Sequence, residues 1–354
     1  MNALTKMYKK DRHIARLVLM TVLWLVFMAI TQFDKFYTIA NFQTIAGKFP
    51  EFGIMALGTM LCMITGGIDL SSVGIANLTS ILMAMYMRYR AGESASISGL
   101  LIAEVFVFAI VIGCAAGAIS GILISKIHIP PILATLGMNQ LLTGLALVVT
   151  NGKAVSDIPT TYSAVINQKL WKVVPGKRGA MMGLIPVQLL FFIAAAVLVW
   201  FLLARTTYGK KLYLMGTSEN VARFSGLKVD RLIIKTYALS GMLAALGGMI
   251  MLANYNSARS DYGSVYSLQC ILIVVLGGVS PTGGKGRISG VMLSIVLLSL
   301  LEAGINRFPQ ISSYYITLIW GAVLLLVMVL NYFADHPLNL RANRSRDRVP
   351  DSNR

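Results

Sequence analysis

Residues 100–125 read LLIAEVFVFAIVIGCAAGAISGILIS, with Glu104 as the only charged residue. A helix needs about 20 consecutive apolar residues to cross the hydrocarbon core of a bilayer, and this stretch is long enough. Similar stretches recur along the 354 residues, of which 56% are hydrophobic and only 13% are charged. Soluble domains carry about 25% charged residues, so the composition excludes a soluble enzyme, a disordered chain and a disulfide scaffold. It predicts an all-α, polytopic transmembrane helical bundle.

We expect about ten spans, several of them short and broken by glycine, as in helices that line transporter cavities. The predicted segments are Ile14–Gln32, Pro50–Gly66, Leu70–Tyr89, Leu100–Ser125, Ala134–Thr150, Met182–Ala204, Ile233–Ala253, Tyr266–Gly277, Ile288–Ile305 and Tyr314–Tyr332. Eight spans are the alternative if the short segments are re-entrant, and either number places both termini on one side. The spans form a transmembrane domain over residues 1–332, and a polar, basic tail follows at 333–354.

The net charge of +17 indicates the orientation of these spans. With ten spans, 20 of the 31 Lys and Arg residues fall on the side of the N-terminus and 11 fall on the other side. Basic residues gather on the cytoplasmic side of membrane proteins, so both termini are predicted to be cytoplasmic. The basicity then requires no nucleic acid. Residues 151–181 become an outer loop and residues 205–231 a cytoplasmic loop.

Two short apolar segments end in a pair of glycines. Leu61–Asp69 reads LCMITGGID and Leu272–Ser280, 211 residues later, reads LIVVLGGVS, with three of nine positions identical. In both places a polar turn follows and another span begins. This placement predicts a weak internal duplication, with a first half at about 14–150 and a second half at about 182–332, of the kind found in duplicated transporter folds.

The acidic residues of the spans allow two interpretations each. Asp69 either caps the next helix by accepting its first free amides or lines a transport path, because a carboxylate at a span boundary must be solvated or paired. Glu104 and Glu302 are either solvated at the outer rim or coupling acids of an ion pathway. For the helix break and the path we select Gly66, Gly67, Asp69, Ser71, Asn77, Gln269, Gly277 and Gly278.

The 205–231 loop contains a short predicted helix. Thr217 or Ser218 can cap that helix, Glu219 lies near its positive end, and Gly226 can end it in the left-handed conformation. A rigid helix between two spans is suited to receive force from a cytoplasmic partner. The alternative is an ordinary connecting loop held at the lipid surface by its Lys and Arg residues.

No motif predicts a catalytic or metal site. Residues 278–286 are rich in glycine, but Val279 stands where a phosphate-binding loop needs its first glycine, and Gly286 stands where Ser or Thr would bind magnesium. Cys62, Cys114 and Cys270 are widely spaced in apolar runs and suit packing. We therefore expect this chain to bind no cofactor and to catalyse no reaction.

Four motifs in order resemble those of the bacterial ABC importer permeases for ribose and other monosaccharides, within the branched-chain amino acid/sugar permease family. The motifs are GGIDLS at Gly66–Ser71, KIHIPPILATLG at Lys126–Gly137, the loop Arg205–Leu227, and the glycines from Gly277 to Gly290. They extend over roughly residues 50–330. The resemblance implies a permease subunit of the bacterial inner membrane that imports a small solute, in particular a monosaccharide.

The resemblance also implies partners. These are a second permease copy or a paralogue, a cytoplasmic ABC ATPase that binds ATP and magnesium, and an extracytoplasmic substrate-binding protein. The 205–231 loop would dock on the ATPase. The residues that we select for this coupling are Arg205, Gly209, Gly216, Glu219, Asn220, Arg223 and Gly226. A secondary, ion-coupled transporter and an integral membrane enzyme are the alternatives.

Overall fold

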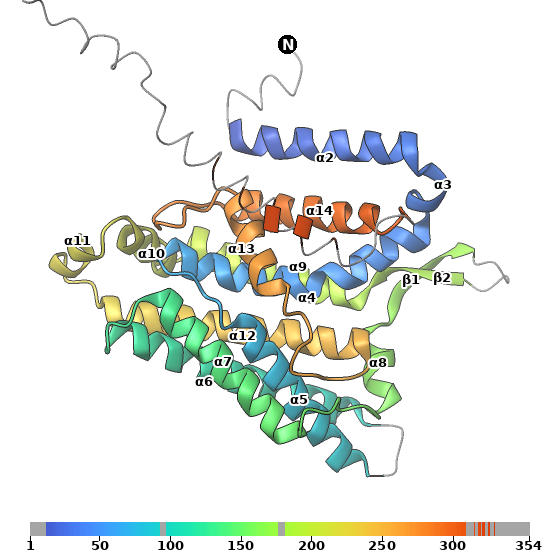
Figure 1. Ribbon diagram of the computed structural model, residues 1–354, viewed down its shortest axis with the longest axis horizontal. Coiled ribbons are helices and arrows are strands. Elements are labelled where there is room, and N and C mark those ends of the chain that lie inside the picture. Colours follow the sequence, from blue (N-terminus) through green and yellow to red (C-terminus); the bar gives the residue numbers. More distant parts are fainter. Residues whose placement is uncertain are drawn as a thin grey trace, which may run out of the picture.

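The computed structural model describes residues 12–92, 97–175 and 181–308, together with residues 315, 318, 319, 321, 322, 325 and 329. Long helices run side by side through the molecule (Figure 1). The helices are α2 Arg12–Thr31, α3 Phe33–Phe36, α4 Ile39–Ile64, α5 Ser72–Ala91, α6 Gly99–Ser125, α7 Pro131–Thr150, α8 Thr160–Ile166, α9 Val187–Arg205, α10 Thr207–Thr217, α11 Glu219–Phe224, α12 Val229–Tyr255, α13 Tyr266–Leu276 and α14 Ile288–Ile305. The strands β1 Lys169–Pro175 and β2 Met181–Pro186 pair in an antiparallel hairpin.

Six of these helices, α2, α6, α7, α9, α12 and α14, are long and apolar enough to cross a membrane. The fold is therefore that of a helical, polytopic membrane protein, as the composition predicts. Helix α13 is apolar but has only 11 residues, in keeping with a broken helix. The predicted segment Tyr314–Tyr332 lies mostly outside the described residues.

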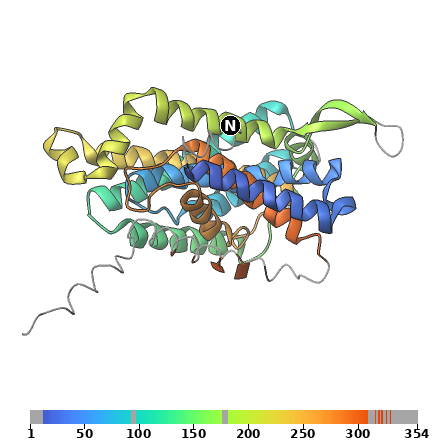
Figure 2. The same ribbon diagram turned by 90° about the horizontal axis from the view of Figure 1, so that it is seen from above.

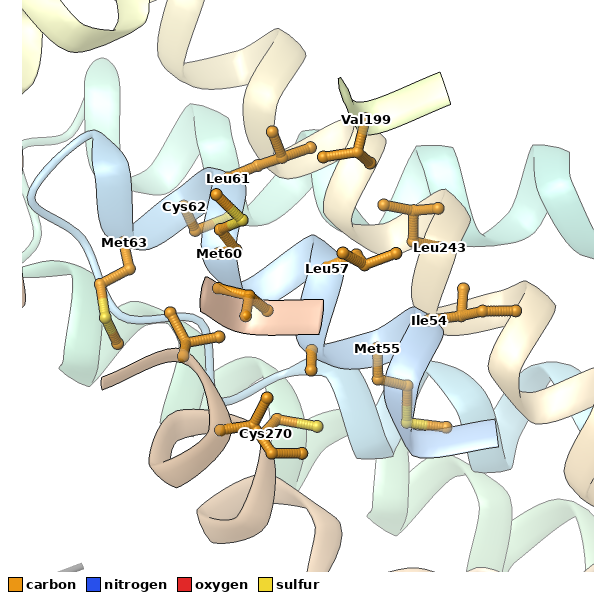
Figure 3. Packing of buried hydrophobic residues seen from close by; sticks show 14 of the residues in the cluster. Ile54, Met55, Leu57, Met60, Leu61, Cys62, Met63, Val199, Leu243 and Cys270 are labelled. Atoms are coloured by element: carbon orange, nitrogen blue, oxygen red, sulfur yellow. The ribbon is translucent and has the colours of Figure 1, made fainter. Parts of the chain in front are cut away.

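Helices α4 and α5 are long but are not among these six, and protein surrounds α4. Every residue of α4 from Phe49 to Ile64 is buried. Its side chains pack with Val199 of α9, Leu243 of α12 and Cys270 of α13 (Figure 3). A helix that other helices shield from lipid can carry polar and charged residues, and α4 contains Lys48 and Glu51.

Helices α6 and α12 approach each other through a ladder of glycines. A Cβ atom added to Gly117 would overlap the carbonyl group of Tyr237, and one added to Gly113 would overlap that of Gly241. Gly121 likewise faces the backbone of Ile234. Small residues allow helices in membranes to pack this closely. The three glycines are spaced four residues apart, which places them on one face of α6.

We expect Gly117→Ala to destabilise the protein, because the added methyl group must displace the backbone of α12. Overpacking of this kind costs about 1–3 kcal/mol. The matched control is Gly144→Ala in α7, where an added Cβ meets no atom within 4 Å. Thermal unfolding of both purified variants in one detergent measures the difference. Equal Tm values for the two variants would contradict the packing role of Gly117.

The two ends of the bundle carry different elements. Helices α10 and α11 lie at one end, which we call the α10 end, and the β1–β2 hairpin lies at the other, which we call the hairpin end (Figures 1 and 2). The first turn of α2 lies at the α10 end, where His13 Nε2 donates to the Leu276 carbonyl at 2.8 Å. At the hairpin end, Lys48 of α4 and Glu302 of α14 form an ion pair at 2.9 Å.

Each of the nine predicted segments within the described residues overlaps one helix, but three boundaries are wrong. Helix α4 begins at Ile39 and not at Pro50, since Thr38 caps it and the proline is accommodated inside the helix. The segment expected from Met182 becomes helical only at Val187, because residues 181–186 pair with β1. A short apolar run does not distinguish strand from helix. Helix α12 begins four residues before Ile233.

Candidate functional site

The first pair of glycines separates α4 from α5. Helix α4 ends at Ile64, and Gly66 has a φ of +86°. The amides of Gly66 and Gly67 donate to the carbonyls of Met63 and Cys62 at 3.0 and 3.2 Å. This pattern is a Schellman motif, which ends a helix with a left-handed residue that is usually glycine. The chain then runs without helical structure until Ser72.

The second pair of glycines ends α13 in the same way. Gly278 has a φ of +84°, and the amides of Gly278 and Val279 donate to the carbonyls of Val275 and Val274 at 3.0 and 3.1 Å. The left-handed residue is the first glycine of the first pair but the second glycine of the second pair. Both of the predicted helix breaks therefore carry the same type of helix end. Its position differs by one residue from the pairing of Leu61–Asp69 with Leu272–Ser280 in the sequence.

Helix α10 ends against the first break and against the glycine turn that follows the second break. The Gly284 amide donates to the Ile64 carbonyl at 2.9 Å. A Cβ atom on Gly283 would lie 2.7 Å from the Gly66 nitrogen and 2.7 Å from the Gly216 carbonyl oxygen. A Cβ on Gly216 would overlap the Ile64 carbonyl. We call these five residues the glycine junction. Because backbone meets backbone there, a displacement of α10 must act on the end of α4 and on the turn that follows α13.

Asp69 lies in the interior of the bundle and is 3% exposed. Its Oδ1 atom accepts from the amide and the hydroxyl of Ser71 at 2.9 and 2.6 Å, and Oδ2 accepts from the Ser240 hydroxyl at 2.6 Å. Asp69 thus joins the start of α5 to the middle of α12. The amide that donates to Asp69 belongs to Ser71, which is itself the N-cap of α5, so Asp69 accepts no amide of the helix and is not the cap that the sequence predicts. A place on the transport path stays a prediction.

The other polar residues selected for the path are buried within the chain. Asn77 of α5 donates to the carbonyls of Ser260 and Tyr262 at 2.8 and 2.9 Å, which ties α5 to the loop after α12. Gln269 of α13 is 1% exposed, and its Nε2 atom has no hydrogen-bond partner in the described part of the chain. Their contribution to a transport path stays a prediction.

The residues selected for coupling lie at the α10 end. Ser218 caps α11 by accepting from the Val221 amide at 3.4 Å, and Gly226 follows with a φ of +78°. The structure also contains α10, which sequence analysis missed although Thr206 caps it. The selected residues occupy the end of α9 (Arg205), α10 (Gly209, Gly216), α11 (Glu219, Asn220, Arg223) and the turn after it (Gly226).

An ion network holds α11 against the first turn of α12. Arg223 pairs with Glu219 and with Asp230, each at 2.8 Å, and Lys126 pairs with Asp230 at 2.9 Å. Hydrogen bonds to Glu219 and then to Asp230 raise the pKa of the Arg223 guanidinium. The network links α11, α12 and the loop after α6.

A basic cavity of about 450 Å³ lies beside this network. Its cations are Lys211, Lys228, Arg231 and Lys235, and all four are exposed. In the part of the chain that the structure describes, no acidic side chain forms an ion pair with any of them. This surface can therefore accept acidic groups of a partner.

Sequence analysis missed Glu51, the most deeply buried acid of the described residues. It is 0% exposed and accepts hydrogen bonds from the Tyr266 hydroxyl and, at 3.1 Å, from Asn254 Nδ2. The criterion that selected Glu104 and Glu302, an acid within an apolar segment, would have found it. Glu51 is the second residue of the predicted span Pro50–Gly66.

Glu104 and Glu302, which the sequence analysis considered as coupling acids, both have cationic partners. Glu302 lies 2.9 Å from Lys48, and Glu104 lies 3.8 Å from Arg90 and accepts from the Tyr86 hydroxyl. A carboxylate that already has a cationic partner is not free to carry a coupling ion. The geometry therefore does not favour an ion-coupled transporter.

Comparison with known proteins matches residues 41–330 to the family described as branched-chain amino acid transport system / permease component. The chain is 32% identical to the ribose import permease protein RbsC of Escherichia coli K12, over 88% of this chain and 92% of the relative. It is 35% identical to RbsC of Bacillus subtilis 168, over 79% and 80%. It is also 32% identical to the autoinducer 2 import system permease protein LsrD of Yersinia enterocolitica, over 79% and 80%. No solved structure matches the chain.

Proposed function

The chain belongs to the family of branched-chain amino acid transport system permease components, and from this we infer that it is the permease subunit of an ABC importer that carries a monosaccharide into the cytoplasm. It is a multi-pass protein of the bacterial inner membrane, and its role is transport and not catalysis. The solute class is taken from the ribose import permeases, which match most of the chain.

We propose a topology of ten spans with both termini in the cytoplasm. The permease domain covers residues 1–332, with halves at about 14–150 and 182–332, the outer loop 151–181 and a basic cytoplasmic tail at 333–354. Support comes from the 20 basic residues on the side of the N-terminus against 11 on the other. The position of His13 at the α10 end agrees, because it puts the start of α2 beside the basic 205–231 loop.

The proposed partners are a second permease copy or a paralogue, an extracytoplasmic binding protein and a cytoplasmic ABC ATPase. ATP and magnesium bind to that ATPase, and this chain binds no cofactor. The exposed Arg and Lys residues around α10 and α11 support a docking surface for the ATPase, since they offer cations to an acidic partner.

The glycine junction is the observation that carries the mechanism. When ATP binding moves the ATPase subunits, they displace α10 and α11. The displacement passes through Gly216 to the end of α4 and to the turn that follows α13. The permease then shifts between outward-facing and inward-facing states, each stabilised by a different ATPase state.

Reconstitution tests this function. Proteoliposomes that contain the permease, its ATPase and its binding protein should accumulate labelled D-ribose or another monosaccharide only when ATP is supplied to the ATPase. Omission of the ATPase should stop uptake. Uptake that continues without the ATPase and collapses when a proton gradient is removed would instead establish a secondary transporter.

We expect the double substitution Glu219→Ala and Arg223→Ala to weaken ATPase coupling strongly while the protein still folds. An exposed ion pair contributes only about 0–1 kcal/mol to stability, but its loss frees α11 to move without moving α12. Retention of the ATPase on tagged permease and substrate-stimulated ATP hydrolysis should both fall severalfold.

The control for this prediction is an exposed ion pair at the opposite end of the molecule. Arg259 and Asp261 lie 2.9 Å apart at the hairpin end, and their double replacement by alanine should leave ATPase retention unchanged. Unchanged stimulation in the Glu219/Arg223 variant would refute the coupling role of α11.

A further inference from the structure

The basic cavity at the α10 end is formed by two helices and the turn between α11 and α12. Its walls are Thr207, Tyr208 and Lys211 of α10, Gly226 and Leu227 of the turn, and Lys228, Arg231, Leu232 and Lys235 at the start of α12. A hydrogen bond of 2.7 Å between the hydroxyls of Tyr208 and Thr236 holds α10 against α12. Cations from both helices therefore line one space of about 450 Å³.

Three of the four cations lie on one face of α12. Lys228 is the N-cap of this helix, and Arg231 and Lys235 follow at spacings of three and four residues. Residues with this spacing are neighbours on a helix surface. Over these positions the helix rises by about 10 Å. The headgroup layer on each side of a bilayer is about 5–8 Å thick, so the row of cations is long enough to cross it.

The same face of α12 becomes apolar where the cations end. Leu239, Met242 and Leu246 continue the spacing of four and three residues, and all three are partly exposed while they pack against the core. Helix α12 is long and apolar enough to cross a membrane. The change from Lys235 to Leu239 therefore marks the boundary between headgroups and acyl chains. A molecule that lies along this face meets cations at one end and apolar side chains at the other.

The neighbouring acidic residues do not neutralise these cations. Asp230, in the first turn of α12, pairs with Arg223 and with Lys126, and Glu219 also pairs with Arg223. The ion pairs of the described residues include none of the four cavity cations. The cavity thus offers several charged donors and no competing carboxylate. Arg and Lys side chains of this kind bind phosphate oxygens through charge-assisted hydrogen bonds.

We propose that this cavity binds the phosphate of an anionic phospholipid such as phosphatidylglycerol, whose acyl chains lie along the apolar part of the same face of α12. Basic pockets between membrane helices are suited to such headgroups. A soluble phosphate ester carries the same charge but has no chain to place against Leu239 and Met242. A zwitterionic lipid has the chains but brings an ammonium group into a space that already holds four cations.

The site goes beyond the proposed function, since it requires a protein in a membrane but no particular solute or orientation. A phosphate in the cavity joins Lys211 of α10 to the first two turns of α12. Cations outside the cavity, among them Lys210 and Arg223, remain for the ATPase.

Binding of short-chain lipids to the purified full-length permease tests the site. The protein in an uncharged detergent is titrated with dioctanoyl phosphatidylglycerol, with dioctanoyl phosphatidylcholine and with glycerol phosphate, and the bound molecules are counted by native mass spectrometry. We expect phosphatidylglycerol to bind roughly tenfold or more tightly than either of the others. Equal binding of phosphatidylcholine would overturn the role of the cations, and equal binding of glycerol phosphate would overturn the role of the acyl chains.

Two adjacent lysines of α10 provide a matched pair of variants. Lys210 and Lys211 are both exposed, but only Lys211 lines the cavity. Replacement of either by glutamine removes one positive charge, so the two variants have the same net charge. Lys211→Gln should weaken phosphatidylglycerol binding roughly fivefold, and Arg231→Gln combined with Lys235→Gln roughly 25-fold. Lys210→Gln should bind as the wild type does, and an equal loss in that variant would mean diffuse attraction and no site.

Two further measurements complete the test. All the replaced side chains are exposed, so the Tm of each variant in detergent without added lipid should equal that of the wild type. The lipid titration is then repeated on the permease assembled with its ATPase. Unchanged binding of phosphatidylglycerol supports a lipid in the working importer. Displacement of the lipid by the ATPase would assign these cations to the ATPase interface and overturn the lipid site.

Discussion

Replacement of Asp69 by leucine is expected to abolish both folding and transport, while Asp69→Asn keeps most of each. Leucine leaves the amide and hydroxyl of Ser71 and the hydroxyl of Ser240 without their acceptor inside the bundle. Each unpaired buried donor costs about 1–3 kcal/mol, and a whole protein is stable by only about 5–15 kcal/mol. Asparagine can still accept from Ser71 and can donate to the Ser240 oxygen.

The yield of monodisperse protein after detergent extraction and ATP-dependent uptake in proteoliposomes measure the two effects. Asp261→Leu is the control, because Asp261 is 61% exposed and pairs only with Arg259 in the described structure. It should be extracted at the wild-type level. A leucine variant at position 69 that transports normally would show that these contacts do not hold α5 in place.

The second large effect is expected for Gly216→Ala, which should reduce uptake more than tenfold. The added methyl group would overlap the Ile64 carbonyl and lie 2.5 Å from the Gly284 nitrogen. Neither is a flexible side chain that can move aside, so α10 must shift away from the end of α4 and from the turn that follows α13. The ATPase can still bind to α11, but its movement no longer reaches α4 and that turn.

ATP hydrolysis and uptake, measured on the same proteoliposomes, distinguish this uncoupling from unfolding. Gly216→Ala should hydrolyse ATP with little uptake. Gly99→Ala, at an exposed position where an added Cβ meets no atom within 4 Å, should behave as the wild type. Normal uptake by Gly216→Ala would mean that force does not pass through the glycine junction.

The apolar segments predict the helices well because each helix must satisfy its own backbone hydrogen bonds within the bilayer. Helix boundaries are predicted less well where a proline lies within a helix, as at Pro50 of α4. They also fail where a short apolar run such as Met181–Pro186 finds a strand partner. In both cases the outcome depends on a neighbouring segment and not on local composition.

The candidate site is predicted only in part. The pairs of glycines and the cap of α11 follow from local rules, because a left-handed residue and a capping hydroxyl act within a few positions. The contact of Gly216 with Gly284 joins residues from separate segments, so no spacing rule reveals it.

The sequence by itself determined the class of this protein, the positions of most of its helices and the residues at which two of them break. These properties depend on the transfer of apolar side chains into lipid and on local backbone conformation. Both are determined by residues that follow one another in the chain. Only the tertiary structure decided that α10 touches the end of α4 and the turn after α13, that Asp69 joins α5 to α12, and that Glu51 is buried against Tyr266 and Asn254. These contacts arise from packing between segments far apart in the chain, and helix packing is decided by the shapes of both surfaces together.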